Sequence, residues 1–183
     1  MIRICKNAPF FNYFLGIYSL KEIYSDKLKI ASAKICQFAI INIDNLHWIV
    51  FIWRKCDELI IFDSLNGELL PTKSEIKNMV HNHIDVNIKL TLFIYGKNNL
   101  QNKDFLTCGE HCLYFIYYEI LYFLKYGYID MLYVNSMIKH CKLHRISTDK
   151  FVWEEIYRKL KLAKPPCLID VLLWKSNSKN DLR

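Results

Sequence analysis

The chain has 183 residues, 52% of them hydrophobic and only five of them glycine, which predicts a packed domain and excludes a disordered or fibrous protein. Seven cysteines and no apolar leader near Met1 favour reduced thiols inside a cell over a secreted disulfide framework. The longest apolar stretch, residues 113–124, contains Glu119 and is shorter than the roughly 20 residues of a membrane span, so we expect a buried helix and no membrane partner. We expect one domain over residues 1–175 and a polar tail over 176–183.

Three runs between residues 34 and 63 predict neighbouring strands. Residues 34–43, 46–53 and 58–63 are rich in Ile, Val, Phe and Trp, which favour buried strands. The segment 54–57 is short enough for a turn, so we expect the last two runs to form an antiparallel hairpin. Residues 86–95 alternate polar and apolar side chains, which predicts a further, half-exposed strand.

Helix starts are marked by two capping-box patterns. The sequence T-K-S-E at 72–75 follows a proline and predicts a helix that ends near residue 83. The sequence T-C-G-E at 107–110 predicts a second helix start and places Cys108 at the first helical position. The helix that follows is apolar on most faces, as expected of a helix packed under a sheet.

Two more helices are predicted after this apolar helix, at residues 130–141 and 148–162. Together these elements predict an α+β domain. We expect a mostly antiparallel mixed sheet packed on a central helix that starts at Cys108, with the other helices as cover. We expect the protein to be a monomer.

The formal net charge of +7 is concentrated late in the chain. Residues 139–164 contain eight Lys or Arg and three acidic residues, a net charge of +5. Such a surface attracts polyanions, including DNA. The same residues fit the solvated surface of helices in a lysine-rich protein, so both interpretations stay open.

Cys108 has the context of a reactive cysteine. A cysteine nucleophile attacks as the thiolate, which a helix N-terminus and a neighbouring imidazolium both stabilise. The predicted helix start supplies the first of these, and His47 is a candidate for the second. The remaining cysteines have no such context and are expected to be structural: Cys5, Cys36, Cys56, Cys112, Cys141 and Cys167.

His47 and Asp63 lie on the two strands of the predicted hairpin. His47 begins one strand and Asp63 ends the next, so an antiparallel hairpin brings them to the same end of the strand pair. Asp63 could then accept a hydrogen bond from the His47 ring and fix its tautomer. Alone, each residue has an ordinary alternative, a structural histidine or a turn aspartate, and the pair is the stronger signal.

Gln101 precedes Cys108 by seven residues in a polar loop. Its amide could donate to an oxyanion together with the Cys108 backbone N–H, although spacing alone does not distinguish it from an ordinary loop residue. His47, Asp63, Gln101 and Cys108 would then supply a base, an orienting carboxylate, an oxyanion donor and a thiol.

Two groups of His and Cys must be weighed as zinc ligands. They are Cys108, His111 and Cys112, and His140, Cys141 and His144. Helical spacing brings Cys108 and His111 only loosely onto one face, and the sequence has no C-x-x-C pair. We therefore expect no metal, and the thiol chemistry requires no other cofactor.

Four short motifs in this order resemble the adenovirus protease (adenain-like) family of cysteine proteases, and more distantly the proteases that process ubiquitin-like modifiers. F-L-G-I-Y at 14–18 resembles the family's Y-F-L-G-x-Y segment, and L-H-W-I-V-F-I-W at 46–53 its H-W-x-x-F-x-W motif. I-F-D-S-L-N-G at 61–67 resembles F-(D/E)-P-F-G, and C-G-E-H-C at 108–112 resembles C-G-x-x-C. The spacing between Gln101 and Cys108 is also that of the family.

The resemblance implies a cysteine endopeptidase with Cys108 as nucleophile, His47 as general base and acid, and Asp63 as orienting acid. Gln101 and the Cys108 amide would form the oxyanion hole. Family members cut viral structural precursor proteins during capsid maturation, often after Gly, and occur in adenoviruses, virophages and virus-like transposons. The implied location is the virion and the host-cell interior, in a virus factory or the nucleus.

The chain departs from this family at two positions. Ser64 stands where proline is frequent, and Leu90 stands near the position of the cysteine that binds an activating peptide by a disulfide in adenovirus enzymes. Activation by such a peptide is therefore not implied, whereas DNA as an activating polyanion is compatible with the basic C-terminal third.

Two other functions remain open at this point. One is a protease of the same chemistry that removes ubiquitin-like modifiers from proteins. The other is a basic DNA-binding core protein that is no enzyme.

Overall fold

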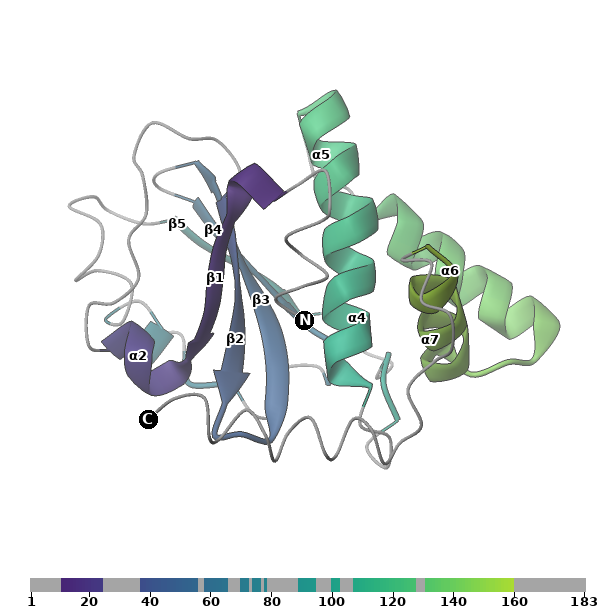
Figure 1. Ribbon diagram of the computed structural model, residues 1–183, viewed down its shortest axis with the longest axis horizontal. Coiled ribbons are helices and arrows are strands. Elements are labelled where there is room, and N and C mark those ends of the chain that lie inside the picture. The colour runs from purple at the N-terminus through teal and green to yellow at the C-terminus, as the bar shows by residue number, and fades with distance from the viewer. Residues whose placement is uncertain are drawn as a thin grey trace.

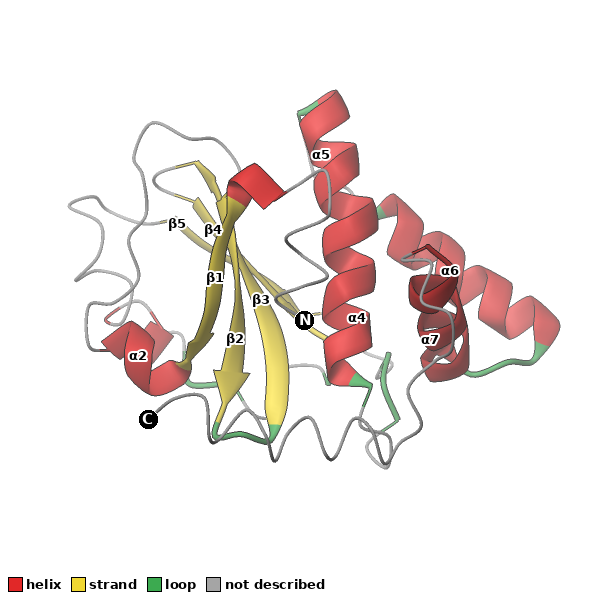
Figure 2. Cartoon of the chain, in the orientation of Figure 1, coloured by secondary structure: helices red, strands yellow, loops and turns green. Residues whose placement is uncertain are grey.

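A mixed β-sheet and a long helical segment that packs on one of its faces organise the fold (Figures 1 and 2). The computed structural model describes residues 11–24, 37–55, 58–65, 70–72, 74–76, 78, 89–94, 100–102, 107–127 and 131–159. Within this part of the chain the fold is α+β, as the sequence predicts.

The sheet has five strands in the spatial order β1-β2-β3-β4-β5. They are β1 (Phe14–Ser19), β2 (Gln37–Ile43), β3 (His47–Lys55), β4 (Glu58–Asp63) and β5 (Lys89–Ile94). The central pairings β2–β3 and β3–β4 are antiparallel, whereas β1–β2 and β4–β5 are parallel. The sheet is mixed, as predicted, but it is not mostly antiparallel, because the long connections on both sides of the central hairpins allow parallel crossovers.

The turn between β2 and β3 fixes where β3 begins. Asp44 and Asn45 both have positive φ, at 48° and 60°, and the N–H of Leu46 donates to the Ile43 carbonyl at 2.9 Å. Two central residues of positive φ define the type I′ turn that suits a tight hairpin, and Asp and Asn tolerate this conformation. The turn places His47 at the first position of β3.

The helices lie mainly after the sheet in the chain. They are the 3₁₀ turn η1 (Phe11–Tyr13), α2 (Leu20–Tyr24), α4 (Cys108–Phe115), the π-helical η2 (Ile116–Ile120), α5 (Leu121–Tyr126), α6 (Leu132–His144) and α7 (Thr148–Lys159). α4, η2 and α5 follow one another without a break and form the predicted central helix. In the described part of the chain, no helix is both long and apolar enough to cross a membrane.

The π-helical turn was not predicted, and it directs a buried acid toward the next helix. Glu119 is fully buried, and its Oε1 accepts hydrogen bonds from the backbone N–H groups of Tyr133 and Val134 at 3.0 and 3.2 Å. These groups lie in the first turn of α6, where helix N–H groups have no partner within the helix. Glu119 therefore joins the central helix to α6 by capping it.

Both faces of the sheet are buried. One face packs against α4, η2 and α5, with α6 and α7 contributing to the same apolar cluster. Phe62 of β4 stacks on Phe115 of α4 in this cluster, with ring centroids 4.2 Å apart and planes 14° apart. The other face has its own cluster, which includes Ile23 of α2. Burial on both faces explains why the central strands are continuous apolar runs.

The helices predicted at 130–141 and 148–162 are found, with some differences at their ends, and of the helix predicted from residue 72 to about 83 the structure describes residues 74–76 and 78 as helical. The capping box at 72–75 is confirmed, because the N–H of Thr72 donates to Glu75 Oε2 at 2.7 Å and the N–H of Glu75 donates to Thr72 Oγ1 at 3.3 Å. α6 begins two residues later than predicted and ends three residues later. The predicted tail 176–183, residues 160–162 and Cys5, Cys36, Cys56 and Cys167 lie outside the described residues.

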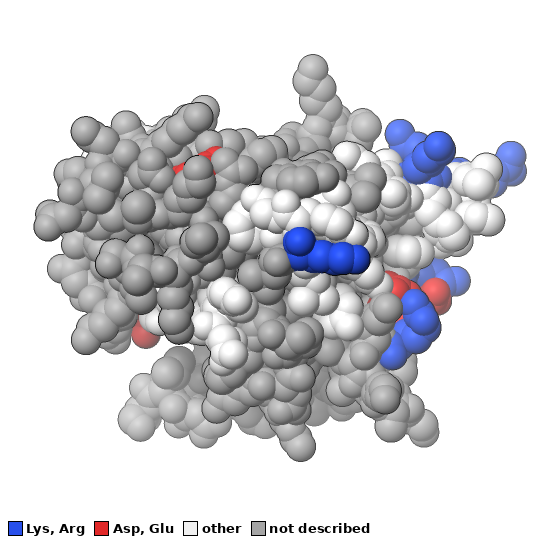
Figure 3. Space-filling view, turned by 90° about the horizontal axis from the view of Figure 1, so that it is seen from above, with Lys and Arg blue, Asp and Glu red and all other residues white. Residues whose placement is uncertain are grey.

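Basic side chains on α6 and α7 are exposed but scattered. Lys139, Lys142 and Arg145 are exposed, whereas Lys150 and Arg158 pair with acids of their own helix, at 3.9 and 2.7 Å. Figure 3 shows the described Lys and Arg side chains of one face in separate groups, some of them beside acidic side chains. On this face they do not form one continuous basic band.

Replacement of Phe115 by alanine should lower the free energy of unfolding by about 3–5 kcal/mol, because it leaves a cavity under the sheet. Urea denaturation followed by circular dichroism measures this loss. Leu143→Ala is the matched control on α6, since Leu143 is 76% exposed and its replacement should change stability by less than about 0.5 kcal/mol. Equal losses in the two variants would contradict the place of Phe115 in the core.

Candidate active site

His47 and Asp63 form a buried pair across the β3–β4 hairpin, as predicted. His47 Nε2 and Asp63 Oδ1 are 2.6 Å apart, and the two side chains are 1% and 0% exposed. Val50 pairs with Phe62 in the ladder, so Asp63 is the diagonal neighbour of His47, at the end of the sheet where β3 begins and β4 ends. The hairpin register thus brings the ring and the carboxylate together.

Asp63 is held in place by its own turn. Its Oδ1 also accepts a hydrogen bond from the backbone N–H of Leu65 at 2.8 Å. An aspartate that binds the N–H two residues further on forms an Asx turn, which restricts its side-chain rotamer. The carboxylate that orients His47 is thereby itself oriented by the backbone.

The environment of His47 favours its charged form. Burial lowers the pKa of the imidazole, but hydrogen bonds and charge interactions with Asp63 and Cys108 outweigh it and raise the pKa to about 9. These contributions also show that the Cys108 sulfur lies beside the ring. Since Nε2 contacts Asp63, Nδ1 is the ring nitrogen left for a bond with the thiol. At neutral pH His47 is therefore an imidazolium between a carboxylate and a sulfur atom.

Cys108 is the first residue of α4, as predicted, but the predicted capping box at its start is wrong. Thr107 is the N-cap residue with φ −100° and ψ 12°, and its side chain makes no capping hydrogen bond. Its hydroxyl donates instead to Asp149 of α7. The long-range bond to a buried carboxylate replaces the local one to the α4 backbone, and Cys108 remains in the first turn of α4, where the helix dipole favours negative charge.

The two other described cysteines are buried and differ from Cys108. Cys112 is fully buried, and its thiol donates to the Trp48 carbonyl at 3.3 Å. Burial, together with the nearby charges of Cys108, Asp63 and Glu110, raises the pKa of Cys112 well above its ordinary value. Burial also raises the pKa of Cys141. Both fit the structural role predicted for them, since a raised pKa disfavours the reactive thiolate.

Neither of the two groups of His and Cys that were weighed as zinc ligands is arranged as a metal site. His111 Nε2 lies 3.1 Å from Asp149 Oδ1, away from the bond of Cys112 to Trp48. Across the described residues, no set of three or more His, Cys, Asp or Glu side chains is placed to hold a metal ion.

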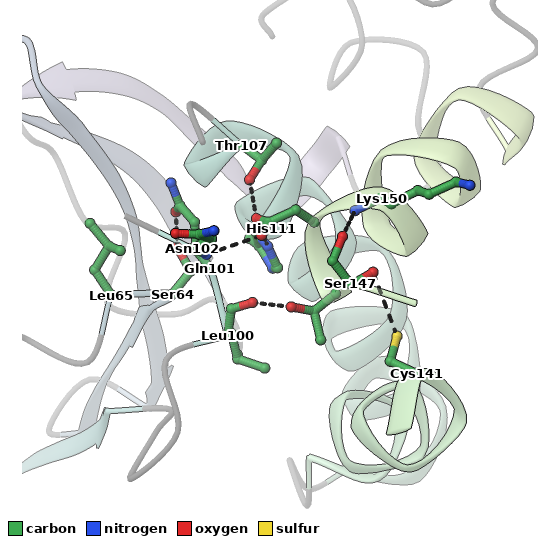
Figure 4. Close-up of polar contacts among 12 residues, drawn as sticks. Ser64, Leu65, Leu100, Gln101, Asn102, Thr107, His111, Cys141, Ser147 and Lys150 are labelled. Atoms are coloured by element: carbon green, nitrogen blue, oxygen red, sulfur yellow. Dashed lines mark hydrogen bonds and ion pairs between the residues drawn. The ribbon is translucent and has the colours of Figure 1, made fainter. Parts of the chain in front are cut away.

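Gln101 is anchored to the residue that follows Asp63. Ser64 Oγ donates to Gln101 Oε1 at 2.7 Å, and the Gln101 backbone N–H donates to the Ser64 carbonyl at 3.2 Å (Figure 4). Both side chains are buried, at 0% and 3% exposed. Because Oε1 accepts from the serine hydroxyl, the orientation of the amide is set, and Nε2 is its donor end.

Asp149 brings the Gln101 loop next to the start of α4. Its Oδ2 accepts from the backbone N–H of Asn102 at 3.0 Å, while its Oδ1 accepts from the hydroxyl of Thr107. One carboxylate therefore binds the residue after Gln101 and the residue before Cys108. This contact places the two predicted oxyanion donors on neighbouring segments.

The site is closed in this conformation. Cys108, His47, Asp63 and Gln101 are each at most 3% exposed. Such burial strengthens electrostatic interactions among the four side chains.

Sequence reasoning missed Asp149 and Ser64. Asp149 lies in the first turn of α7, where an acid is ordinary because it complements the helix dipole. Ser64 was noted only as a departure from a family motif. No local signal in the sequence could have assigned either residue to the site, because their partners lie 37 to 47 residues away in the chain.

The chain was compared with protein-family models, with curated proteins and with solved structures, and nothing matched it in any of the three. The functional assignment accordingly depends on the geometry described above and on the motifs.

The ring of His47 should titrate near pH 9 in an NMR titration, rather than near the ordinary value of about 6.5. Asp63→Asn removes the neighbouring charge and should move this titration to lower pH. His140→Gln is the control, since His140 is an exposed histidine on α6, and it should leave the His47 titration unchanged. A His47 ring that titrates near pH 6.5 in the parent would contradict the described pair.

Proposed function

We propose that this protein is a cysteine endopeptidase with an adenain-like fold. The single observation that carries the proposal is the His47–Asp63 pair beside Cys108 at the N-terminus of α4. A nucleophile, a base within reach and a third group that orients the base are the signature of covalent catalysis in hydrolases. The order of His, Asp, Gln and Cys along the chain and the four motifs support the same proposal.

Acylation would begin with attack of the Cys108 thiolate on the carbonyl carbon of the scissile peptide bond. A carbon–sulfur bond forms, and the carbonyl π electrons move to the oxygen. The Cys108 backbone N–H and Gln101 Nε2 donate to this oxyanion. The His47 imidazolium then gives its proton to the leaving nitrogen, the carbon–nitrogen bond breaks, and the amine product departs from a thioester.

Deacylation would use the same residues in the reverse roles. Neutral His47 takes a proton from water as the water oxygen attacks the thioester carbon. The second oxyanion collapses, the carbon–sulfur bond breaks, and the acid product leaves with Cys108 again a thiolate beside the His47 imidazolium. Asp63 keeps the ring in the orientation that points Nδ1 at the sulfur throughout both steps.

The substrates we propose are viral capsid and core precursor proteins, cut during virion maturation. This proposal is supported by the motifs at 14–18, 46–53, 61–67 and 108–112, which resemble a family with this role. We propose the virion and the host-cell interior as the location. The exposed basic residues of α6 offer contacts for DNA as an activating polyanion.

Purified protein should cleave a Gly-containing capsid precursor, and Cys108→Ala should abolish the cleavage because the nucleophile is lost. Cys141→Ala is the matched control: it removes another buried thiol, from α6, and should retain activity. Mass spectrometry of the products identifies the cleaved bond. Equal cleavage by the parent and by Cys108→Ala would falsify the proposed chemistry, whereas turnover of modifier-derived substrates alone would change only the substrate.

Gln101→Ala should lower kcat by about 10²–10³-fold, as expected for removal of an oxyanion donor. KM should change little, because the donor acts mainly on the transition state. Steady-state kinetics on one peptide substrate measure both constants. Asn102→Ala is the matched control in the same loop, since its exposed side chain is removed and its backbone N–H is kept. An unchanged kcat in Gln101→Ala would contradict the proposed role of Gln101 as an oxyanion donor.

A further inference from the structure

We propose that Asp149 is the positioning residue of the oxyanion hole, which it holds by binding the chain next to Gln101 and next to Cys108. This inference rests on the proposed function, because it assigns a role within that site. Asp149 lies on α7, 41 positions after Cys108 in the sequence, and none of the motifs contains it.

Three donors converge on the Asp149 carboxylate. They are the Asn102 backbone N–H at 3.0 Å, His111 Nε2 at 3.1 Å and the hydroxyl of Thr107. The carboxylate is only 3% exposed. Burial alone would raise the pKa of Asp149, but the hydrogen bonds from His111, Thr107 and Asn102 lower it below its ordinary value. Asp149 is therefore a stable anion that orders three separate groups.

Two of these donors, the backbone N–H of Asn102 and the side-chain hydroxyl of Thr107, belong to residues whose peptide units adjoin the proposed oxyanion donors. The Asn102 N–H is part of the peptide bond that joins Gln101 to Asn102, so its position fixes the backbone of Gln101. Thr107 contributes the carbonyl half of the peptide bond whose N–H belongs to Cys108. By holding both units, Asp149 sets the separation between the Gln101 amide and the Cys108 N–H.

Further bonds hold the same loop from both sides. Thr148, the neighbour of Asp149, donates through its hydroxyl to the carbonyl of Leu100. Ser64, at the end of β4, binds both the side chain and the backbone of Gln101. Figure 4 shows Leu100, Gln101 and Asn102 between Ser64 on one side and the start of α7 on the other. We call these three residues, Ser64, Thr148 and Asp149, the polar clamp of the loop. Of the three, Asp149 also binds His111 of α4 and Thr107 directly before it.

The effect of Asp149 is expected on the transition state and not on the thiol. None of its described partners is His47 or Asp63, the residues proposed to activate Cys108. Oxyanion stabilisation depends on donors placed to a fraction of an ångström, so a loosened loop lowers kcat more than it weakens substrate binding.

Asp149→Asn tests the proposal, with Glu154→Gln as the matched control. Glu154 is an acid on the same helix whose side chain is 57% exposed and pairs only with Lys150 among the described residues, at 3.9 Å. We expect Asp149→Asn to lower kcat about 10²-fold with KM changed less than about threefold. The rate of Cys108 alkylation by iodoacetamide should stay within about threefold, and Glu154→Gln should match the parent throughout.

A second, milder variant tests the proposal even if Asp149→Asn does not fold. Thr107→Val keeps the shape of the side chain and removes one of the three donors, and kcat should fall about tenfold with alkylation unchanged. Circular dichroism and thermal denaturation verify that each variant is folded. The proposal is overturned if both variants are folded and keep the kcat of the parent, or if alkylation falls as much as kcat.

Hydrogen exchange separates this inference from the proposed function. The backbone amides of Asn102 and Cys108 should exchange about tenfold faster in Asp149→Asn than in Glu154→Gln, because the clamp is lost. If the parent cleaves no peptide but this difference is found, the protease proposal is wrong, whereas the structural role of Asp149 in holding the loop is supported. If these amides exchange equally in the two variants, the clamp is wrong whatever the activity.

Discussion

The hydrogen bond between His47 and Asp63 is the interaction on which the site depends. Both groups are buried, and a buried polar pair is tolerated only when its partners are supplied by the structure. The type I′ turn at Asp44 and Asn45 sets the start of β3, and the ladder with β4 then sets the offset of the two residues. A shift of one residue in this register would move His47 to the other face of the hairpin and break the pair.

Apolar packing places the thiol, and polar contacts then orient the groups around it. The stacked rings of Phe62 and Phe115 fix α4 against β4, which brings the N-terminus of α4 to the end of the sheet where His47 lies. Packing of this kind is strong but not directional. The finer alignment comes from hydrogen bonds, in which Ser64 and Asp149 hold the Gln101 loop against both the sheet and α4.

The sequence predicts those parts of the fold that depend on short-range patterns. The strands over 37–63, the hairpin and the helix start at Cys108 follow from apolar runs and local turn residues, so the His47–Asp63 contact could be predicted. The strand predicted over 86–95 is found as β5, but the parallel pairings of β1 and β5 and the clamp at Asp149 depend on partners far away in the chain. The capping box at Thr107 failed for the same reason, since the buried Asp149 carboxylate takes the hydroxyl that the local pattern assigned to the helix.

The structure contains two buried Asp–His pairs, and their surroundings separate their roles. His47 contacts Asp63 and interacts with Cys108, the candidate nucleophile. His111 lies one turn after Cys108 on α4, but its Nε2 contacts Asp149. The charge of Asp149 is spread over three donors, whereas a second unscreened anion near an oxyanion would oppose catalysis. The first pair therefore lies against the candidate nucleophile, and the second orders the segments that precede it in the chain.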